Sequence, residues 1–163
     1  MRATWHFSAA TARLESEAAV LLELRRGADG ALEAPFEQVL WRLLDLGYWE
    51  PCTEVYRNGL LFARLARPIG MARTVLTVLD GDRYHFKIIH GNTPRLSLVN
   101  GMGREVMVQR AVDPGLLAAD VRIHRERIPR GDLAVLLLLA GHVFHGILRE
   151  RSGKEPLASA ALS

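Results

Sequence analysis

Alternating apolar and polar positions dominate the middle of the chain. Three pairs of alternating segments, each joined by a glycine-containing turn, occupy 53–67 with Asn58-Gly59, 74–89 with Asp80-Gly81, and 95–110 with Asn100 to Gly103. Period-two alternation predicts half-buried β-strands, and Asn-Gly is the commonest two-residue hairpin turn because both of its positions adopt positive φ. The turns begin at 58, 80 and 100. The pattern therefore predicts an antiparallel hairpin repeated every 20–22 residues.

The fourth strand of this series shows the alternation most clearly. Tyr84, Phe86 and Ile88 share one face of segment 82–89, and the residues between them are charged or polar. A further strand is predicted over 116–128, with Val121 and Ile123 facing inward. Seven strands are therefore predicted between residues 53 and 128.

A long apolar segment, Asp132 to Leu148, follows the last predicted strand. No side chain between Leu133 and Ala140 is polar. A helix that is apolar on every side is either enclosed by protein or lies in a membrane. Asp132 is expected to act as the N-cap, because a carboxylate there accepts hydrogen bonds from the unpaired backbone N–H groups of the first turn.

The first 46 residues give a weaker pattern. Trp5 to Phe7 reads as the start of a strand, although Ala9 to Glu17 has a helix-favouring composition. Val20 to Leu24 fits either element, and periodicity does not separate helix from strand in so short a run. Phe36 to Leu46 presents a helical face at 36, 39, 40, 43 and 44, but also a strand side at 39, 41 and 43. Both interpretations stay open for this segment.

The elements together predict a mainly β fold with one helix (α+β). An antiparallel barrel of repeated hairpins would enclose the C-terminal hydrophobic helix, since closure both buries the helix and removes exposed sheet edges. We assign residues 1–151 to this single domain, with the choice between helix and strand left open in 1–38. Residues 152–163 are small and weakly patterned, and we expect a flexible tail there.

Three segments carry a resemblance to a known family: LWRLLDLGYWEPCTEVYRNGLLFARLARP (40–68), LSLVNGMGREVMVQR (96–110) and VRIHRERIPRGDLAVLLLLAGHVFHGIL (121–148). Over roughly 40–148 the chain resembles the tubby C-terminal-like superfamily, which includes phospholipid scramblases and LURP-one-related proteins. The resemblance implies a twelve-stranded antiparallel barrel around a hydrophobic helix and an anionic membrane lipid as partner. The cysteine-rich and acidic calcium-site segments of animal scramblases are absent from the sequence, so calcium-driven lipid flipping is not carried over.

Charge and cysteine content narrow the function classes. The net charge is +3, but residues 1–56 carry −4 and residues 57–163 carry +7. A basic half favours an anionic partner, although solvated arginines on outward strand positions are the simpler explanation. A single cysteine, Cys52, excludes an internal disulfide and a cysteine-based zinc cluster. The N-terminus lacks an apolar run of signal-peptide length, and we therefore expect a cytoplasmic protein.

Candidate binding residues come from the densest positive stretch of the chain. Its members, which could hold phosphate groups at one edge of the barrel, are Arg122, His124, Arg125, Arg127 and Arg130. The simpler interpretation is an outward-facing strand surface.

Two histidines and the lone cysteine are the other candidates for chemistry. His142 and His145 lie three residues apart on the predicted helix and could bind a metal, with His124 as a distant third ligand. A buried histidine pair is the alternative. Cys52 has no identifiable base beside it in the sequence.

The sequence therefore predicts a non-enzymatic binding protein with no cofactor and no bound metal. The resemblance adds anionic phospholipid as the partner, peripheral association with a membrane, and neither a nucleic-acid partner nor a stable membrane span. Two alternatives remain from other classes: a protein anchored in the membrane by its tail through 133–148, and a metal-dependent enzyme built on His142 and His145.

Overall fold

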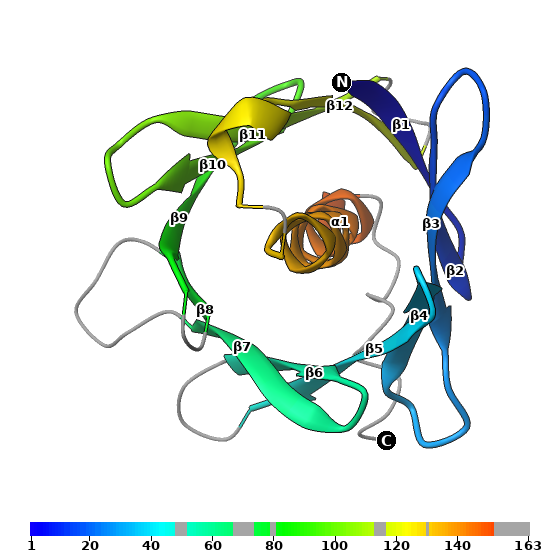
Figure 1. Ribbon diagram of the computed structural model, residues 1–163. Coiled ribbons are helices and arrows are strands. Elements are labelled where there is room, and N and C mark those ends of the chain that lie inside the picture. The colour runs from blue at the N-terminus through cyan, green and yellow to red at the C-terminus, as the bar shows by residue number, and fades with distance from the viewer. Residues whose placement is uncertain (48–51, 67–73, 79–80, 113–116, 130, 152–163) are drawn as a thin grey trace.

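A computed structural model describes residues 1–47, 52–66, 74–78, 81–112, 117–129 and 131–151. In this part of the chain, twelve antiparallel strands close into a barrel around one long helix (Figure 1). The strands are β1 (Arg2–Phe7), β2 (Thr11–Glu15), β3 (Val20–Arg26), β4 (Leu32–Phe36), β5 (Val39–Leu46), β6 (Cys52–Arg57), β7 (Leu60–Ala66), β8 (Thr74–Val78), β9 (Arg83–Ile89), β10 (Arg95–Asn100), β11 (Glu105–Ala111) and β12 (Ala118–Ile123). A short 3₁₀ helix, η1 (Arg125–Arg127), precedes the helix α1 (Leu133–Arg151). The predicted fold class, an antiparallel barrel of hairpins that encloses a C-terminal hydrophobic helix, is confirmed.

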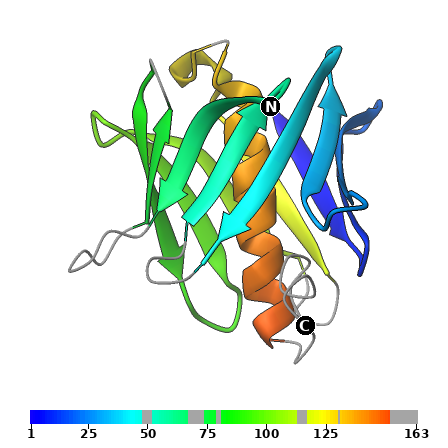
Figure 2. The same cartoon turned by 90° about the horizontal axis from the view of Figure 1, so that it is seen from below.

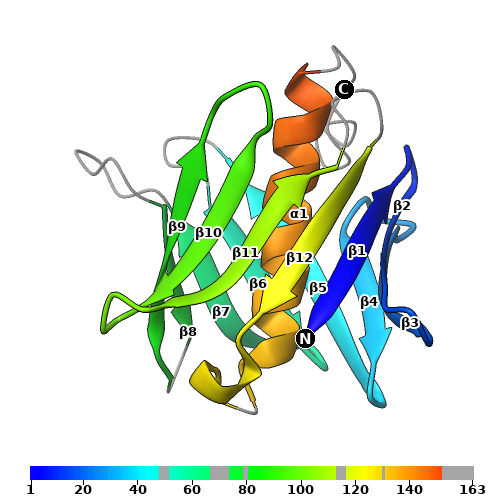
Figure 3. The same cartoon turned by 90° about the horizontal axis from the view of Figure 1, so that it is seen from above.

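The barrel is a simple up-and-down meander. Every strand pairs with its neighbours in sequence, and β1 closes the ring by pairing with β12 in the register Ala3 to Val121 and Trp5 to Ala119. Closure leaves none of the twelve described strands with an unpaired edge, which removes the template for edge-to-edge aggregation. Figures 2 and 3 show α1 running along the barrel axis, so that the two openings of the barrel lie at the two ends of the helix.

The repeated hairpins lie where the alternation predicts them. Asn58 and Gly59 both adopt positive φ, 48° and 83°, as the predicted turn requires. At the next described turn, the side-chain oxygen of Asn100 accepts hydrogen bonds from the backbone N–H groups of Met102 and Arg104. Asp80, in the remaining predicted turn, lies outside the described residues.

The N-terminal segment continues the same series of strands. The helix-favouring composition of Ala9 to Glu17 is misleading, because this segment contains the strand β2. Phe36 to Leu46 is also strand, and its helical interpretation is wrong. Trp41 and Leu43 are buried on the inner wall, whereas Leu40 faces outward. Pairing on both sides within the barrel overrides the local helix propensity.

The strand predicted over 116–128 is too long. Its described part ends at Ile123, after which η1 turns the chain from the wall into the interior. Backbone hydrogen bonds from Arg127 to the carbonyl of His124 and from Ile128 to that of Arg125 hold this turn. Without it, the chain would continue beyond the barrel instead of entering it.

Helix α1 is enclosed on all sides along its first half. Residues Val135 to Leu139 are 0–2% exposed. The wall also makes a polar contact with the helix through the side-chain amide of Gln109. Its oxygen accepts a hydrogen bond from Trp5 Nε1 at 3.2 Å, and its nitrogen donates to the backbone carbonyl of Ala140 at 3.1 Å. Close packing follows at the next residue, Gly141, where a Cβ atom would lie 2.5 Å from the indole of Trp5. Residues 152–163, where a tail was predicted, lie outside the described part.

Candidate functional site

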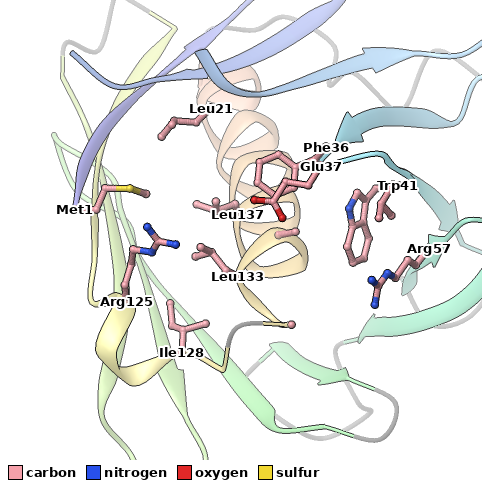
Figure 4. A pocket seen from close by; sticks show the side chains of 13 residues that line it. Met1, Leu21, Phe36, Glu37, Trp41, Arg57, Arg125, Ile128, Leu133 and Leu137 are labelled. Carbon is pink, nitrogen blue, oxygen red and sulfur yellow. The ribbon is translucent and has the colours of Figure 1, made fainter. Parts of the chain in front are cut away.

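A cavity of about 550 Å³ opens at the end of the barrel where α1 begins, and we call it the mouth cavity (Figure 4). Its wall is formed by the first turns of the helix, the turn between β4 and β5, and the ends of β5, β6 and η1. The lining residues are Met1, Leu21, Phe36, Glu37, Val39, Trp41, Arg57, Arg125, Ile128, Gly131, Leu133, Ala134 and Leu137. Its size is typical of a small-molecule site, and so is its apolar wall with a few charged groups.

Strand register places Arg57 in this cavity. Trp41 on β5 lies directly opposite Arg57 on β6, and Leu43 lies opposite Val55 in the same pairing. Side chains two residues apart on a strand share a face. Because Val55 is fully buried inside the barrel, Arg57 also points inward, at the open end of its strand.

Aromatic rings position the Arg57 guanidinium at the mouth. Its Cζ lies 5.8 Å from the ring centroids of both Trp41 and Phe62, and these two rings meet edge to face at 5.2 Å. A cation over an aromatic face is attracted by the ring quadrupole. The Trp41 indole is only 3% exposed, and its Nε1 has no hydrogen-bond partner among the described residues. The wall of the cavity therefore holds one cation beside two aromatic rings and, among the described residues, one unpaired buried donor.

Arg125 brings a second cation to the cavity from the opposite wall (Figure 4). Its neighbours in the predicted basic stretch are engaged elsewhere. Arg127 donates to the carbonyl of Glu105 at 2.9 Å and lies 3.6 Å from Glu126, and His124 lies 3.5 Å from the same carboxylate. Arg125 has no ion-pair partner in the described part of the chain, which leaves its charge available at the mouth.

The rest of the predicted basic stretch does not join the mouth cavity. Arg122 faces outward on β12, where it lines a separate surface hollow together with Arg2 and Arg110. Arg130 lies outside the described residues. The interpretation of the stretch as an outward strand face is correct for Arg122, but it is wrong for Arg125, which lies on η1.

Glu37 contributes the acidic group of the mouth cavity. It occupies the two-residue turn between β4 and β5 with Gln38, and both have positive φ, 49° and 63°. Such turns normally contain Asn or Gly. No ion pair of Glu37 is found in the described part of the chain. The mouth cavity thus combines two guanidinium groups and one carboxylate around an apolar wall.

A second cavity of about 450 Å³ adjoins the first and shares Arg57 with it. Asp132 lines it, and its carboxylate accepts a hydrogen bond from the hydroxyl of buried Tyr84 at 2.7 Å. Burial raises the pKa of Asp132, against the opposing effect of this hydrogen bond, and burial likewise raises the pKa of Tyr84. Asp132 was predicted as the N-cap. Its backbone carbonyl does accept the first helical bond, from Leu136, but its carboxylate is bonded to the barrel wall.

The two histidines of α1 lie toward the other opening and do not form a metal site together. His142 Nε2 lies 3.1 Å from Asp45 Oδ1, and the same oxygen accepts from the Thr53 hydroxyl at 2.6 Å. His145 is 1% exposed and stacks on Phe7 at 4.9 Å. Burial, with the charges of Arg149 and His142, lowers the pKa of His145 to about 3. Among the residues described, no cluster of three or more His, Cys, Asp or Glu side chains could hold a metal.

Cys52, the other candidate for chemistry, is half-buried at the first position of β6. It pairs in register with Leu46 and Ala66 on the neighbouring strands, which lie at the opening away from the mouth cavity. It is therefore not part of the mouth cavity.

Comparison of the chain with protein-family models, with curated proteins and with solved structures finds no match. The resemblance to the tubby C-terminal-like superfamily therefore stays a prediction, and the function has to be argued from the mouth cavity. Arg125 belongs to the basic stretch that the sequence singles out, whereas nothing in the sequence singled out Trp41, Arg57 and Glu37. The alternation of segment 53–57, which puts Val55 and Arg57 on one face, was the available signal.

Proposed function

We propose that this chain is a non-enzymatic lipid-binding protein, and that its mouth cavity takes the head group and the first part of the acyl chains of an anionic phospholipid. The observation that carries the proposal is the combination of an apolar wall with two guanidinium groups, Arg57 and Arg125, that have no ion-pair partner in the described part of the chain. Guanidinium groups bind phosphate oxygens through paired, charge-assisted hydrogen bonds.

Two exposed apolar side chains at the same end of the barrel support contact with a membrane surface. Leu60, the first residue of β7, and Met102, in the turn between β10 and β11, lie at this opening and are 76% and 75% exposed. Apolar tips beside basic residues are typical of proteins that lie at the membrane interface. We infer peripheral association from the cytoplasmic side, where anionic lipid attracts basic residues.

The tail-anchor alternative depends on the same helix that fills the barrel. By length and composition, Leu133–Glu150 could cross a membrane, but 67% of it is buried inside the protein. Inserting it into a bilayer would require the barrel to open and expose its inner wall to water. The metal-enzyme alternative has no observation in its favour, since His142 and His145 are held by different partners.

Vesicle sedimentation tests the proposal. We expect binding to anionic vesicles that weakens with salt, and little binding to neutral vesicles. Arg57→Gln with Arg125→Gln should weaken binding roughly 30-fold, since each basic residue near an anionic surface contributes about 1 kcal/mol. Arg110→Gln with Arg122→Gln removes the same charge from the outer wall and serves as the matched control. Equal losses in both double variants would contradict a site in the mouth cavity.

A further inference from the structure

The mouth cavity is lined by three charged side chains for which the described part of the chain shows no oppositely charged partner. Arg57, Arg125 and Glu37 all line it, and no ion pair of any of them is found in the described part of the chain. Elsewhere in the barrel, charged side chains are commonly paired, as Arg95 is with Glu105 at 3.0 Å. Unpaired charges of both signs around one hollow indicate a ligand that itself carries both signs.

Glu37 is held at the cavity by a backbone conformation that its residue type disfavours. A left-handed conformation is uncommon for residues other than glycine, asparagine and aspartate, and here both Glu37 and Gln38 adopt it. In the view of Figure 4, the Glu37 carboxylate is turned toward the helix and lies between Arg125 and Arg57. A simple anionic ligand would place its phosphate near this carboxylate without any compensating contact.

We propose that Glu37 makes the mouth cavity selective for phospholipids whose head group carries an ammonium beside its anionic groups. This inference rests on the proposed lipid-binding function and specifies its ligand class. Phosphoserine is the best match, because its phosphate and carboxylate can each face one guanidinium while its ammonium faces Glu37. The net charge of +1 on the three side chains complements the net charge of −1 on such a head group.

The test compares two lipids of equal net charge. Short-chain phosphatidylserine and phosphatidylglycerol, both below their micelle concentration, are titrated into the protein by calorimetry. Both head groups carry a net charge of −1, so non-specific attraction is equal, and phosphatidylserine differs by one added ammonium and one added carboxylate. We expect phosphatidylserine to bind roughly fivefold more tightly, the size of one partly exposed ion pair.

Two matched variants locate the effect. Glu37→Gln should bring the affinity ratio of the two lipids close to one, largely by improving phosphatidylglycerol binding. Glu17→Gln, which removes the same charge from the neighbouring turn between β2 and β3, should leave the ratio unchanged. A ratio unaffected by Glu37→Gln, or a wild-type preference for phosphatidylglycerol, would overturn the inference while leaving lipid binding intact.

A third titrant separates lipid from a soluble ligand. Glycerophosphoserine carries the same charged groups, including a singly charged phosphodiester, without acyl chains, and we expect much weaker binding, because it leaves the apolar wall unfilled. Binding as tight as that of the lipid would overturn the assignment to phospholipid. Failure of both lipids to bind would overturn the proposed function itself, and this selectivity with it.

Discussion

Two glycines of α1 provide a test of how tightly the barrel encloses its helix. A Cβ atom at Gly141 would lie 2.5 Å from Trp5 Cζ2 and 2.8 Å from Cε2, whereas a Cβ at Gly146 meets nothing within 4 Å. Trp5 is fully buried and its indole is bonded to Gln109, so it has little room to move. Alanine should therefore raise the free energy of unfolding at Gly146 but not at Gly141.

The magnitudes follow from two known effects. Replacing a helical glycine by alanine gains about 1 kcal/mol of helix propensity, and Gly146→Ala should show this gain. Overpacking a tight core costs about 1–3 kcal/mol, so Gly141→Ala should be neutral to 2 kcal/mol less stable than the wild type. The gain in helix propensity is common to both variants, so the difference between their free energies of unfolding gives the cost of the clash with Trp5.

Urea unfolding followed by circular dichroism measures both variants. For a chain of this size, each 1 kcal/mol corresponds to about 2–4 °C in Tm, so a thermal melt gives an independent check. Trp5→Phe in the Gly141→Ala background should recover part of the loss, since it removes the ring that the new methyl group meets. Equal stabilisation by both alanine variants would refute close packing of the helix against β1.

Three further predictions concern the polar contacts of the barrel. Burial raises the pKa of Asp132, and the hydrogen bond from the Tyr84 hydroxyl partly offsets this by stabilising the ionised carboxylate. Tyr84→Phe removes that hydrogen bond, so the loss in unfolding free energy should be small at acid pH and grow to about 1–3 kcal/mol toward neutral pH. A loss that does not change with pH would contradict this coupling. The hydrogen bond and charge of His142, with the Thr53 hydroxyl, hold the pKa of Asp45 below its usual range despite burial. The stability that ionised Asp45 contributes is therefore lost as pH falls through that lowered pKa. His142→Gln should move the midpoint of acid unfolding, followed by circular dichroism, to higher pH. An unmoved midpoint would contradict this coupling. Gln38→Gly relieves a left-handed residue and should raise the unfolding free energy in urea by about 1 kcal/mol, whereas a loss of stability would show that the turn is not strained.

The repeated hairpins and the enclosed helix could be predicted because their signals are local. Alternation identifies a strand with one buried face, and a run such as Leu136 to Leu139 requires enclosure whatever surrounds it. The first strands were harder to identify because composition misleads there. The turn formed by Glu37 and Gln38 lacks Asn and Gly, so nothing in the sequence marked it as a hairpin.

The mouth cavity could be predicted only in part. Arg125 stood out because it belongs to a dense basic stretch, but density alone did not separate it from outward-facing Arg122. Trp41 and Arg57 meet through the pairing of β5 with β6, and Glu37 lines the same cavity from the turn between β4 and β5. Such a combination depends on strand register and barrel closure, which no single segment of the chain determines.

The indole N–H resonances of the tryptophans test the central claim most directly. Trp41 lines the mouth cavity, whereas Trp5 is buried beside the helix with its N–H bonded to Gln109. In a ¹H–¹⁵N correlation spectrum, with Trp41→Phe and Trp5→Phe used for assignment, short-chain phosphatidylserine should shift the Trp41 signal in a saturable way and leave the Trp5 signal in place. An unmoved Trp41 signal under saturating lipid would contradict phospholipid binding in the mouth of the barrel.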